Sequence, residues 1–209
     1  KINDSIKKLY KPGIYTEVLY KTGKIDCVLN NCLMEHGFNK QGENYPDFIK
    51  GVRLIDFMVV FTTPEDIYKL EKNYDVNIHT LEDLETVYRK FVDESISTGV
   101  VGFKLATAYI RPIDFKDYSR EKAQGLLKKI LQFQKAQWRA GEAITTEEGT
   151  DLTNYCVHLM LKIIEEKNMP IAIHTGLHSQ GGLDVRWSDP QLLTPLFREY
   201  KNVNFDIYH

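Results

Sequence analysis

The stretch VVGFKLA (100–106) decides which fold this sequence is predicted to adopt. Successive side chains of a β-strand point to opposite faces. One face of this segment would therefore carry the large apolar residues Val101, Phe103 and Leu105, and the other Val100, Gly102, Lys104 and Ala106. The first face suits packing against helices, whereas the second is small and carries a single amine towards its C-terminal end.

The segment PIAIHT (170–175) repeats this pattern, because Ile171 and Ile173 alternate with Ala172 and His174. A face of small residues that ends in one polar group is what the interior of a barrel with an active site at its C-terminal mouth requires. No glycine-rich phosphate loop follows the first strand, which counts against a doubly wound dinucleotide-binding sheet. The sequence therefore predicts an α/β fold of the (β/α)8 TIM-barrel type over an open doubly wound sheet.

Apolar runs rich in β-branched residues alternate with longer helical patterns along the chain. The predicted strands are 25–31, 52–60, 99–109, 169–176 and 203–209. The predicted helices are 4–22, with a break at Pro12-Gly13, then 80–97, 119–140, 146–167 and 190–200. Helix starts are marked by Thr80 with Asp83, by Thr146, and by Asp189 before Pro190. Strands that alternate with helices pair in parallel through crossovers.

The length of 209 residues is short for this fold, because a complete eight-stranded barrel takes about 250 residues. The predicted strands correspond to about strands two to six, and the sequence stops on a strand-ending histidine. We therefore expect residues 1–209 to form one incomplete barrel domain, truncated at both ends, that lacks strands one, seven and eight.

Composition argues against several classes of protein. A formal net charge of −2 with 27% charged residues gives no field that favours nucleic acid or an anionic membrane. No apolar run approaches the roughly 18–20 residues of a membrane-spanning helix, and the first residues do not resemble a signal peptide. Three cysteines, Cys27, Cys32 and Cys156, are too few for a disulfide framework. We expect a cytoplasmic protein that acts on a small molecule, with assembly into homo-oligomers left open.

Two histidines at predicted strand ends carry the functional prediction. His174 is followed by Thr175-Gly176, where the chain has to turn, and His209 ends the next strand. Neutral imidazole binds divalent metals such as zinc, and adjacent parallel strands lie about 4.8 Å apart. A lone strand histidine is more often a satisfied core residue, but two at consecutive strand ends favour a shared metal ion.

Lys104 is the third candidate, in the middle of a predicted strand beside Gly102 and Ala106. Burial lowers the pKa of a lysine and leaves a nucleophilic amine. Such an amine can form a Schiff base, or capture carbon dioxide as a carbamate that ligates metal. The alternative is a lysine that reaches the barrel mouth or pairs with an acid. The residues alone leave these alternatives open.

Further candidates lie in the loops after these strands. Substrate contacts are expected at Tyr109, Arg111, His178, Arg186 and Trp187. An arginine there could clamp a carboxylate or a phosphate, and the alternative for each residue is an ordinary loop position with local hydrogen bonds. Arg53 and Asp56 are predicted to pair structurally, with a position at the barrel mouth as the alternative, and His158 is predicted to pack in the core. Asp206 is predicted to support the site from the face opposite His209.

Three segments together resemble a known family: GVVGFKLATAYIRP (99–112), PIAIHTGLHSQGGLDVRWSDPQLLTPLF (170–197) and VNFDIYH (203–209). They look like the amidohydrolase-related metal-dependent hydrolases. More narrowly they are similar to the branch that includes the amidohydrolase-like domains fused to glutamine synthetase, with a distant likeness to uronate isomerases. The resemblance implies metal binding by His174 and His209, with Lys104 at the position of a lysine that is carbamylated in some subgroups. The family's His-x-His pair on strand one and its aspartate on strand eight have no counterpart here.

Three functions follow from this resemblance. The favoured one is a metal-dependent hydrolase of an amide, ester or lactone bond in a small polar molecule, with one or two divalent ions, zinc first. A water activated by the metal would attack, and the general-base aspartate would lie outside this chain. The second is a metal-dependent sugar-acid isomerase or decarboxylase, which a lysine without a carbamate would favour. The third is a binding or scaffolding domain without metal.

Overall fold

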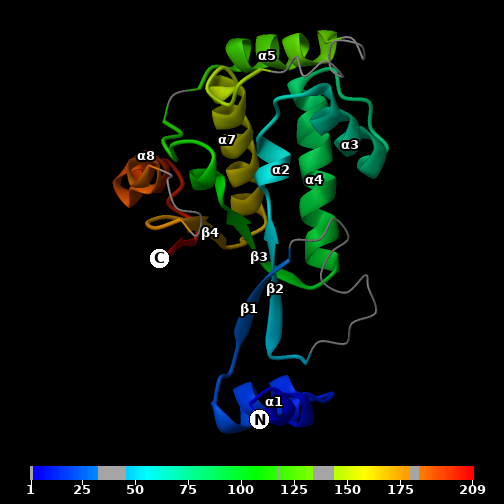
Figure 1. Cartoon of the computed structure of the whole chain (residues 1–209). Coiled ribbons are helices and arrows are strands. Elements are labelled where there is room, and N and C mark those ends of the chain that lie inside the picture. The colour runs from blue at the N-terminus through cyan, green and yellow to red at the C-terminus, as the bar shows by residue number, and fades with distance from the viewer. Residues whose placement is uncertain (1, 33–45, 117, 134–143, 179–183) are drawn as a thin grey trace.

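A parallel β-sheet forms the centre of the molecule (Figure 1). The computed structural model describes residues 2–32, 46–116, 118–133, 144–178 and 184–209. Within these residues the strands are β1 (Val28–Cys32), β2 (Ile49–Leu54), β3 (Val100–Leu105), β4 (Ile171–His174) and β5 (Phe205–Tyr208). Every neighbouring pair is parallel, and the order of the strands in space is their order along the chain.

This strand order distinguishes the two folds that the sequence allowed. In a doubly wound sheet the order reverses at a switch point, whereas in a TIM barrel each strand lies beside the next one along the chain. The five described strands follow the second rule and form a curled half-barrel. The predicted barrel architecture is therefore confirmed in its coarse form, while the numbering of the strands as two to six stays a prediction.

Helices connect the strands of the sheet. They are α1 (Ile2–Leu9), α2 (Asp56–Val59), α3 (Pro64–Tyr74), α4 (Leu81–Ser97), α5 (Arg120–Gln132), α7 (Thr150–Glu166) and α8 (Thr194–Glu199). A π-helical segment spans Thr16–Thr22, and three short 3-10 turns are η2 (Thr107–Tyr109), η3 (Val185–Ser188) and η4 (Pro190–Leu193). Among the described helices, none is both long enough and apolar enough to cross a membrane.

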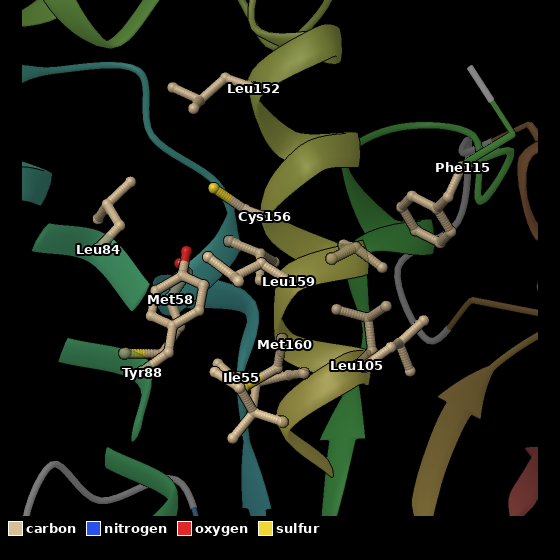
Figure 2. Packing of buried hydrophobic residues seen from close by; sticks show 14 of the residues in the cluster. Ile55, Met58, Leu84, Tyr88, Leu105, Phe115, Leu152, Cys156, Leu159 and Met160 are labelled. Carbon is tan, nitrogen blue, oxygen red and sulfur yellow. The ribbon is translucent and has the colours of Figure 1, made fainter. Parts of the chain in front are cut away.

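One apolar cluster joins the helices to the sheet (Figure 2). Phe103 and Leu105 of β3, and Ile171 and Ile173 of β4, are at most 1% exposed and belong to this cluster with side chains of α4 and α7. The predicted alternation of these strands is thus confirmed at four positions. Val101 is the exception, because it is 37% exposed.

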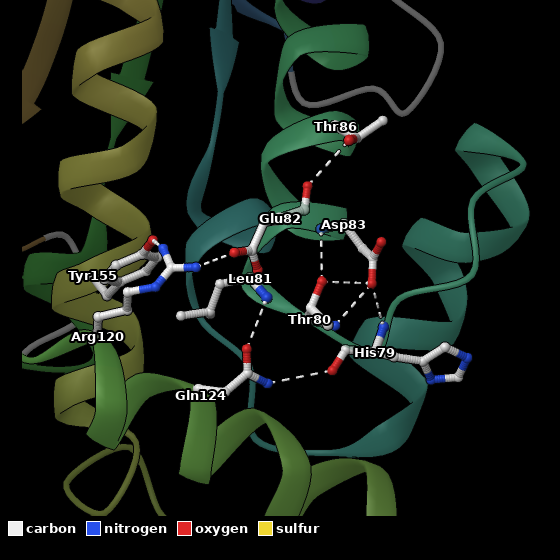
Figure 3. Close-up of polar contacts among 9 residues, drawn as sticks. All are labelled: His79, Thr80, Leu81, Glu82, Asp83, Thr86, Arg120, Gln124 and Tyr155. Atoms are coloured by element: carbon white, nitrogen blue, oxygen red, sulfur yellow. Dashed lines mark hydrogen bonds and ion pairs between the residues drawn. The ribbon is translucent and has the colours of Figure 1, made fainter.

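Helix α4 begins where the sequence predicts (Figure 3). The hydroxyl of Thr80 accepts from the backbone N–H of Asp83 at 3.2 Å, and Asp83 accepts from the N–H groups of Thr80 (2.8 Å) and His79 (2.9 Å). Gln124 of α5 accepts from the N–H of Leu81 at 3.1 Å and donates to the carbonyl of His79 at 3.3 Å. The capping box therefore also anchors α5 to the start of α4.

Two predicted elements end or begin elsewhere. The predicted strand 52–60 stops at Leu54, because Ile55 is followed by the helical turn α2. The predicted cap at Thr146 is wrong, since α7 begins at Thr150 without a side-chain cap. Instead, Thr145 and Glu148 close the preceding turn, each accepting a hydrogen bond from the backbone N–H of the other.

The remaining helical predictions are met in part. Helix α3 was not predicted, although Thr63 and Asp66 form a capping box at its start. The predicted helix 119–140 corresponds to α5, and residues 134–143 lie outside the described part of the chain. The expected break at Pro12-Gly13 is confirmed, because α1 ends at Leu9 and Gly13 has a φ of +84°.

Candidate functional site

His174 is the last residue of β4, and the core around that strand sets its position. Ile171 and Ile173 are buried in the helix-facing cluster, so His174 lies on the opposite face at the C-terminal end of the strand. The chain then turns at Gly176, whose φ of +73° lies in the left-handed region. A Cβ at this position would lie 3.2 Å from the carbonyl oxygen of His209. The expected turn is present, and glycine allows it to lie against His209.

The structure brings His174 and His209 together. Their ring centroids are 4.9 Å apart, with an angle of 64° between the ring planes. The backbone N–H and the hydroxyl of Thr175 both donate to the carbonyl oxygen of Tyr208 at 3.0 Å. These two hydrogen bonds join the end of β4 to the end of β5 and hold the histidines side by side.

His174 is 3% exposed and is held in its neutral form. Desolvation lowers its pKa, and the nearby His209, Lys104 and His178 lower it further, while a hydrogen bond to the backbone of Leu177 acts in the opposite direction. Neutral imidazole is the form that binds a metal ion. The Nε2 atom is buried and has no hydrogen-bond partner among the described residues. A buried polar atom of this kind needs a ligand or an ordered water to complete it.

Lys104 lies on the same face of the sheet as His174, one strand away. Its amine lies 3.4 Å from the centroid of the Tyr208 ring, and the residue is 4% exposed. Desolvation lowers the pKa of Lys104 to about 8, against the charges of Asp206 and Asp56, which raise it. At neutral pH the amine is therefore mostly an ammonium ion that an aromatic face and two carboxylates stabilise. This environment favours a lysine paired with acids.

The end of β5 explains how His209 reaches His174. Asp206 aligns with Ala172, and Tyr208 aligns with His174, so these side chains share the interior face of the sheet. His209 follows Tyr208 and would point to the other face in a regular strand. Its φ of +70° takes the backbone out of the extended conformation, which allows the ring to lie beside His174.

Asp56 belongs to this group of residues but was not predicted as part of it. It follows the end of β2, and its carboxylate accepts from the backbone N–H of Ala106 at 3.0 Å. Desolvation raises the pKa of Asp56 to about 6, while the hydrogen bond from Ala106 and the charge of Lys104 lower it. The available signal was a carboxylate directly after a buried run, which marks the C-terminal end of a barrel strand.

The rings of Tyr109 and His178 lie against the ring of His174. The Tyr109 ring lies 4.6 Å from the His174 ring and 4.8 Å from the His178 ring, and the two histidine rings are 5.4 Å apart. Both ring nitrogens of His178 are buried and have no hydrogen-bond partner among the described residues. Two of the predicted substrate contacts are thus adjacent to the histidine pair.

The other predicted substrate contacts are divided between a cavity and the solvent. Arg111 and Trp187 line the same cavity, of about 530 Å³. Arg186 instead forms an ion pair with Asp184 at 2.6 Å, and its side chain is 90% exposed. This position gives no support to a substrate contact at Arg186.

Arg53 and His158 have structural surroundings. The guanidinium of Arg53 donates to the hydroxyl of Ser95 at 3.1 Å and lies 4.5 Å from the centre of the Phe91 ring, both on α4. These contacts direct the guanidinium towards α4, and the predicted pair with Asp56 is not among them. His158 is buried as predicted, with its two ring nitrogens 2.8 Å from the Tyr200 hydroxyl and 2.7 Å from the Phe115 carbonyl oxygen.

The described residues bring two candidate metal ligands together. His174 has an unpartnered ring nitrogen, and His209 lies beside it. However, in the part of the chain that the structure describes, no group of three or more His, Cys, Asp or Glu side chains is arranged to hold a metal ion. The donor set therefore fits two imidazole ligands, and any further ligand has to come from Lys104, water or substrate, or from residues outside the described ranges.

Comparison with known proteins shows which solved structures share the fold of this chain. No protein-family model and no curated protein sequence matches the chain. The structure is similar to a uronate isomerase from Thermotoga maritima, with a TM-score of 0.60 at 15% identity over 87% of this chain. A glucuronate isomerase from Caulobacter crescentus gives 0.60 at 12% identity over 95% of the chain. A proposed metal-dependent hydrolase from Lactobacillus casei gives 0.53 at 15% identity over 76%.

The chain spans less than half of each of these structures: 43%, 44% and 37% of their lengths. At this level of identity the similarity shows a shared barrel fold and leaves the reaction open. The α/β barrel fold that the sequence motifs implied is confirmed in its coarse form, as a half-barrel of five described parallel strands. The narrower likeness to domains fused to glutamine synthetase stays a prediction.

Proposed function

We propose that this chain carries part of the active site of a metal-dependent hydrolase that cleaves an amide, ester or lactone bond of a small polar molecule. One observation supports this most directly. The buried, unpartnered Nε2 of His174 lies at the C-terminal end of β4, with the ring of His209 beside it at the end of β5. In barrels of this fold the ends of the strands hold the catalytic groups.

His174 and His209 would hold a divalent ion, with zinc as the first candidate because two imidazoles suit it. Such an ion, when bound, polarises a carbonyl group and lowers the pKa of a water molecule. Tyr109 and His178 would contact the substrate and exclude bulk water. Lys104 is proposed as a further ligand or as a positive charge that stabilises developing negative charge on the substrate. The general-base aspartate is proposed to lie outside this chain.

A second candidate is a sugar-acid isomerase or a decarboxylase on the same barrel. The environment of Lys104 favours it, because Asp56, Asp206 and the Tyr208 ring stabilise an ammonium ion where a carbamate would add negative charge. Without the carbamate, a site with one metal ion is expected. Uronate and glucuronate isomerases are also among the structures that share this fold.

Metal binding tests both candidates. The chain, freed of metal and dialysed against buffered Zn²⁺, should take up one ion. His174→Asn and His209→Asn should each weaken uptake at least about tenfold, because each removes a ligand. His79→Asn is the matched control, since His79 is exposed at the start of α4.

Two results would contradict the proposal: no uptake of Zn²⁺ by the wild-type chain, or equal uptake by the His174 and His209 variants. His174 is buried, so its variant needs a circular dichroism spectrum that matches the wild type. His209 is exposed, and its variant provides the test that folding does not complicate. Two assays on metal-loaded protein then separate the two reactions. Hydrolysis of a lactone would support the hydrolase, and interconversion of an aldose and a ketose would support the isomerase.

A further inference from the structure

A second candidate binding site lies in the cavity of about 530 Å³ between η2, η3 and the start of α7. Arg111, which follows η2, and Trp187 of η3 line this cavity, with Thr146, Glu147 and Thr150 at the start of α7. The backbone N–H of Ile113 donates to the carbonyl of Trp187 at 2.9 Å, which fixes the two loops to one another. None of His174, His209 or Lys104 lines this cavity.

Arg111 is the unusual residue of the cavity. It is 5% exposed, and burial lowers its pKa to about 10, the charge of Asp114 opposing that change. Its Nε donates to the carbonyl of Pro112 at 3.1 Å and its Nη2 to the carbonyl of Asp114 at 3.3 Å. Its third nitrogen, Nη1, is buried without a hydrogen-bond partner among the described residues. Leaving a charged donor buried and unpaired costs free energy, which a bound acceptor would recover.

The start of α7 adds to the positive potential of Arg111. Thr150 is the first residue of this 17-residue helix, and its own N–H already donates to the carbonyl of Glu147 at 3.2 Å. The helix N-terminus therefore acts on an anion through its partial positive charge. The hydroxyl of Thr150 lies within 3.4 Å of the carbonyl of Thr146, so both threonines are at this end of the cavity. A guanidinium and a helix N-terminus therefore lie at one cavity.

The other charges of the lining limit the kind of anion. Two carboxylates, Asp114 and Glu147, also line the cavity, and Asp114 forms an ion pair with Lys116 at 3.0 Å. A doubly charged anion such as phosphate would be repelled by these carboxylates. A singly charged carboxylate that also carries a hydroxyl or amino donor suits this lining better. Its carboxylate would lie at Arg111, its donor would face a lining carboxylate, and its carbon skeleton would lie against Trp187.

We propose that this cavity binds a small molecule with a carboxylate and a neighbouring hydrogen-bond donor, and that the carboxylate accepts a hydrogen bond from Nη1 of Arg111 after a small rotation of the side chain. The site is separate from the histidine pair. Binding of the carboxylate requires no metal ion, so this proposal can be tested independently of the proposed metal-dependent function.

Fluorescence of Trp187 provides the test. The chain contains two tryptophans, so Trp138→Phe leaves Trp187 as the only reporter. L-Lactate, added to this variant in the presence of a chelator, should change the fluorescence in a saturable way. Lactamide has the same shape without the charge, and should bind at least about tenfold more weakly, as should inorganic phosphate.

Variants then assign the binding to Arg111. Arg111→Gln in the same background should weaken lactate binding at least about tenfold, whereas Arg198→Gln, which removes an exposed charge on α8, should change it less than about twofold. Arg111→Lys keeps the charge and should retain part of the affinity for lactate. It replaces Arg111→Gln as the test if the Gln variant folds poorly.

Four results would overturn the proposal. The first is no saturable response to lactate. The second is equal binding of lactate and lactamide by protein with Arg111 intact, a comparison that does not depend on the folding of any Arg111 variant. The third is equal lactate binding by folded Arg111→Gln. Tighter binding of phosphate than of lactate would overturn the assignment to carboxylates.

Discussion

Lys104 shows how one residue in the barrel interior can be tuned by its neighbours. Burial removes water from the amine, and the pKa falls from 10.5 to about 8. Asp206 and Asp56 oppose this change, and the Tyr208 ring lies 3.4 Å away. The residue is therefore charged at neutral pH although it is 4% exposed. In a folded protein such a charge is retained at a cost in stability.

The cost of this charge should appear as a pH dependence. The pKa of Lys104 is lower in the folded chain than in the unfolded chain, so this residue binds more protons in the unfolded chain between pH 8 and 10.5, and its contribution to stability rises with pH across that window. Lys104→Met removes the amine, and at pH 7 we expect it to increase the free energy of unfolding by roughly 1–3 kcal/mol. Urea unfolding at pH 7, 9 and 10.5 measures this gain, which should shrink as the pH rises.

Lys162→Met is the control for the Lys104 variant, because Lys162 is exposed on α7. It should change stability by less than about 0.5 kcal/mol at each pH. A gain in Lys104→Met that stays constant from pH 7 to 10.5 would show that the methionine acts by packing and that the charge of Lys104 is not destabilising.

At the residue scale, strand order and strand alternation could be used to predict the histidine pair and Lys104, but not the part of Asp56 or the surroundings of the loop arginines. Consecutive parallel strands lie side by side, so two histidines at their ends had to be close. Asp56 was missed because the apolar run 52–60 was interpreted as one strand, whereas its second half is helical. Arg111 and Arg186 are both loop arginines in the sequence. Only tertiary contacts make one buried and the other exposed.

At the element scale, the contact between β3 and β4 depends on a glycine. A Cβ on Gly102 would lie 3.1 Å from Cγ and 3.2 Å from the carbonyl oxygen of Pro170, which is the acceptor for the N–H of Phe103 at 3.0 Å. The small interior face that indicated a barrel in the sequence is therefore required by the spacing of the strands.

Gly102→Ala should lower the free energy of unfolding by roughly 1–3 kcal/mol, because the added methyl pushes β3 and β4 apart. Gly125→Ala is the matched control: it lies inside α5, where a Cβ meets no atom within 4 Å. That change should increase stability by roughly 0.5–1 kcal/mol through helix propensity. Chemical denaturation measures both. A neutral Gly102→Ala would mean that the two strands lie further apart than the structure shows.

The same side-chain capping of backbone N–H groups underlies both the helix starts that were predicted correctly and the one that was predicted wrongly. Thr80 with Asp83 and Asp189 with Pro190 were identified correctly, because their side chains cap the backbone within a few residues. Thr146 failed because Thr145 and Glu148 use the same chemistry to close an isolated turn before α7. Sequence patterns thus indicate a cap without fixing whether a helix or a turn follows it.

At the scale of the whole molecule, the alternation of strands and helices was sufficient to predict a parallel α/β sheet. The interior face of small residues then favoured the barrel over the open sheet, and the strand order agrees. What could not be predicted is how the stability is distributed. That distribution depends on which elements contribute side chains to the shared apolar cluster. Residues 3–22 contribute none.

The segment 3–22, which holds most of α1 and the π-helical turn, has no buried side chain. Figure 1 shows α1 beyond the end of β1, away from the layer of α4 and α7. The ring of Tyr20 stacks on that of Phe48, with centroids 5.5 Å apart, but short helices with so little tertiary packing are marginally stable in water. In hydrogen-exchange measurements we therefore expect the amides of this segment to exchange at least about a hundredfold faster than those of α7, which is packed in the core along most of its length.

The exposed apolar side chains of this segment, Ile6, Leu9, Tyr10, Tyr15, Val18 and Tyr20, give the exchange experiment a second use. Self-association through them would bury apolar surface and slow exchange as the protein concentration rises. Exchange at two concentrations, with sedimentation velocity at the same concentrations, separates the cases. Fast exchange at both concentrations would support an unpacked segment. Slow exchange at low concentration, in protein that sediments as a monomer, would contradict it and place the segment against the rest of the chain.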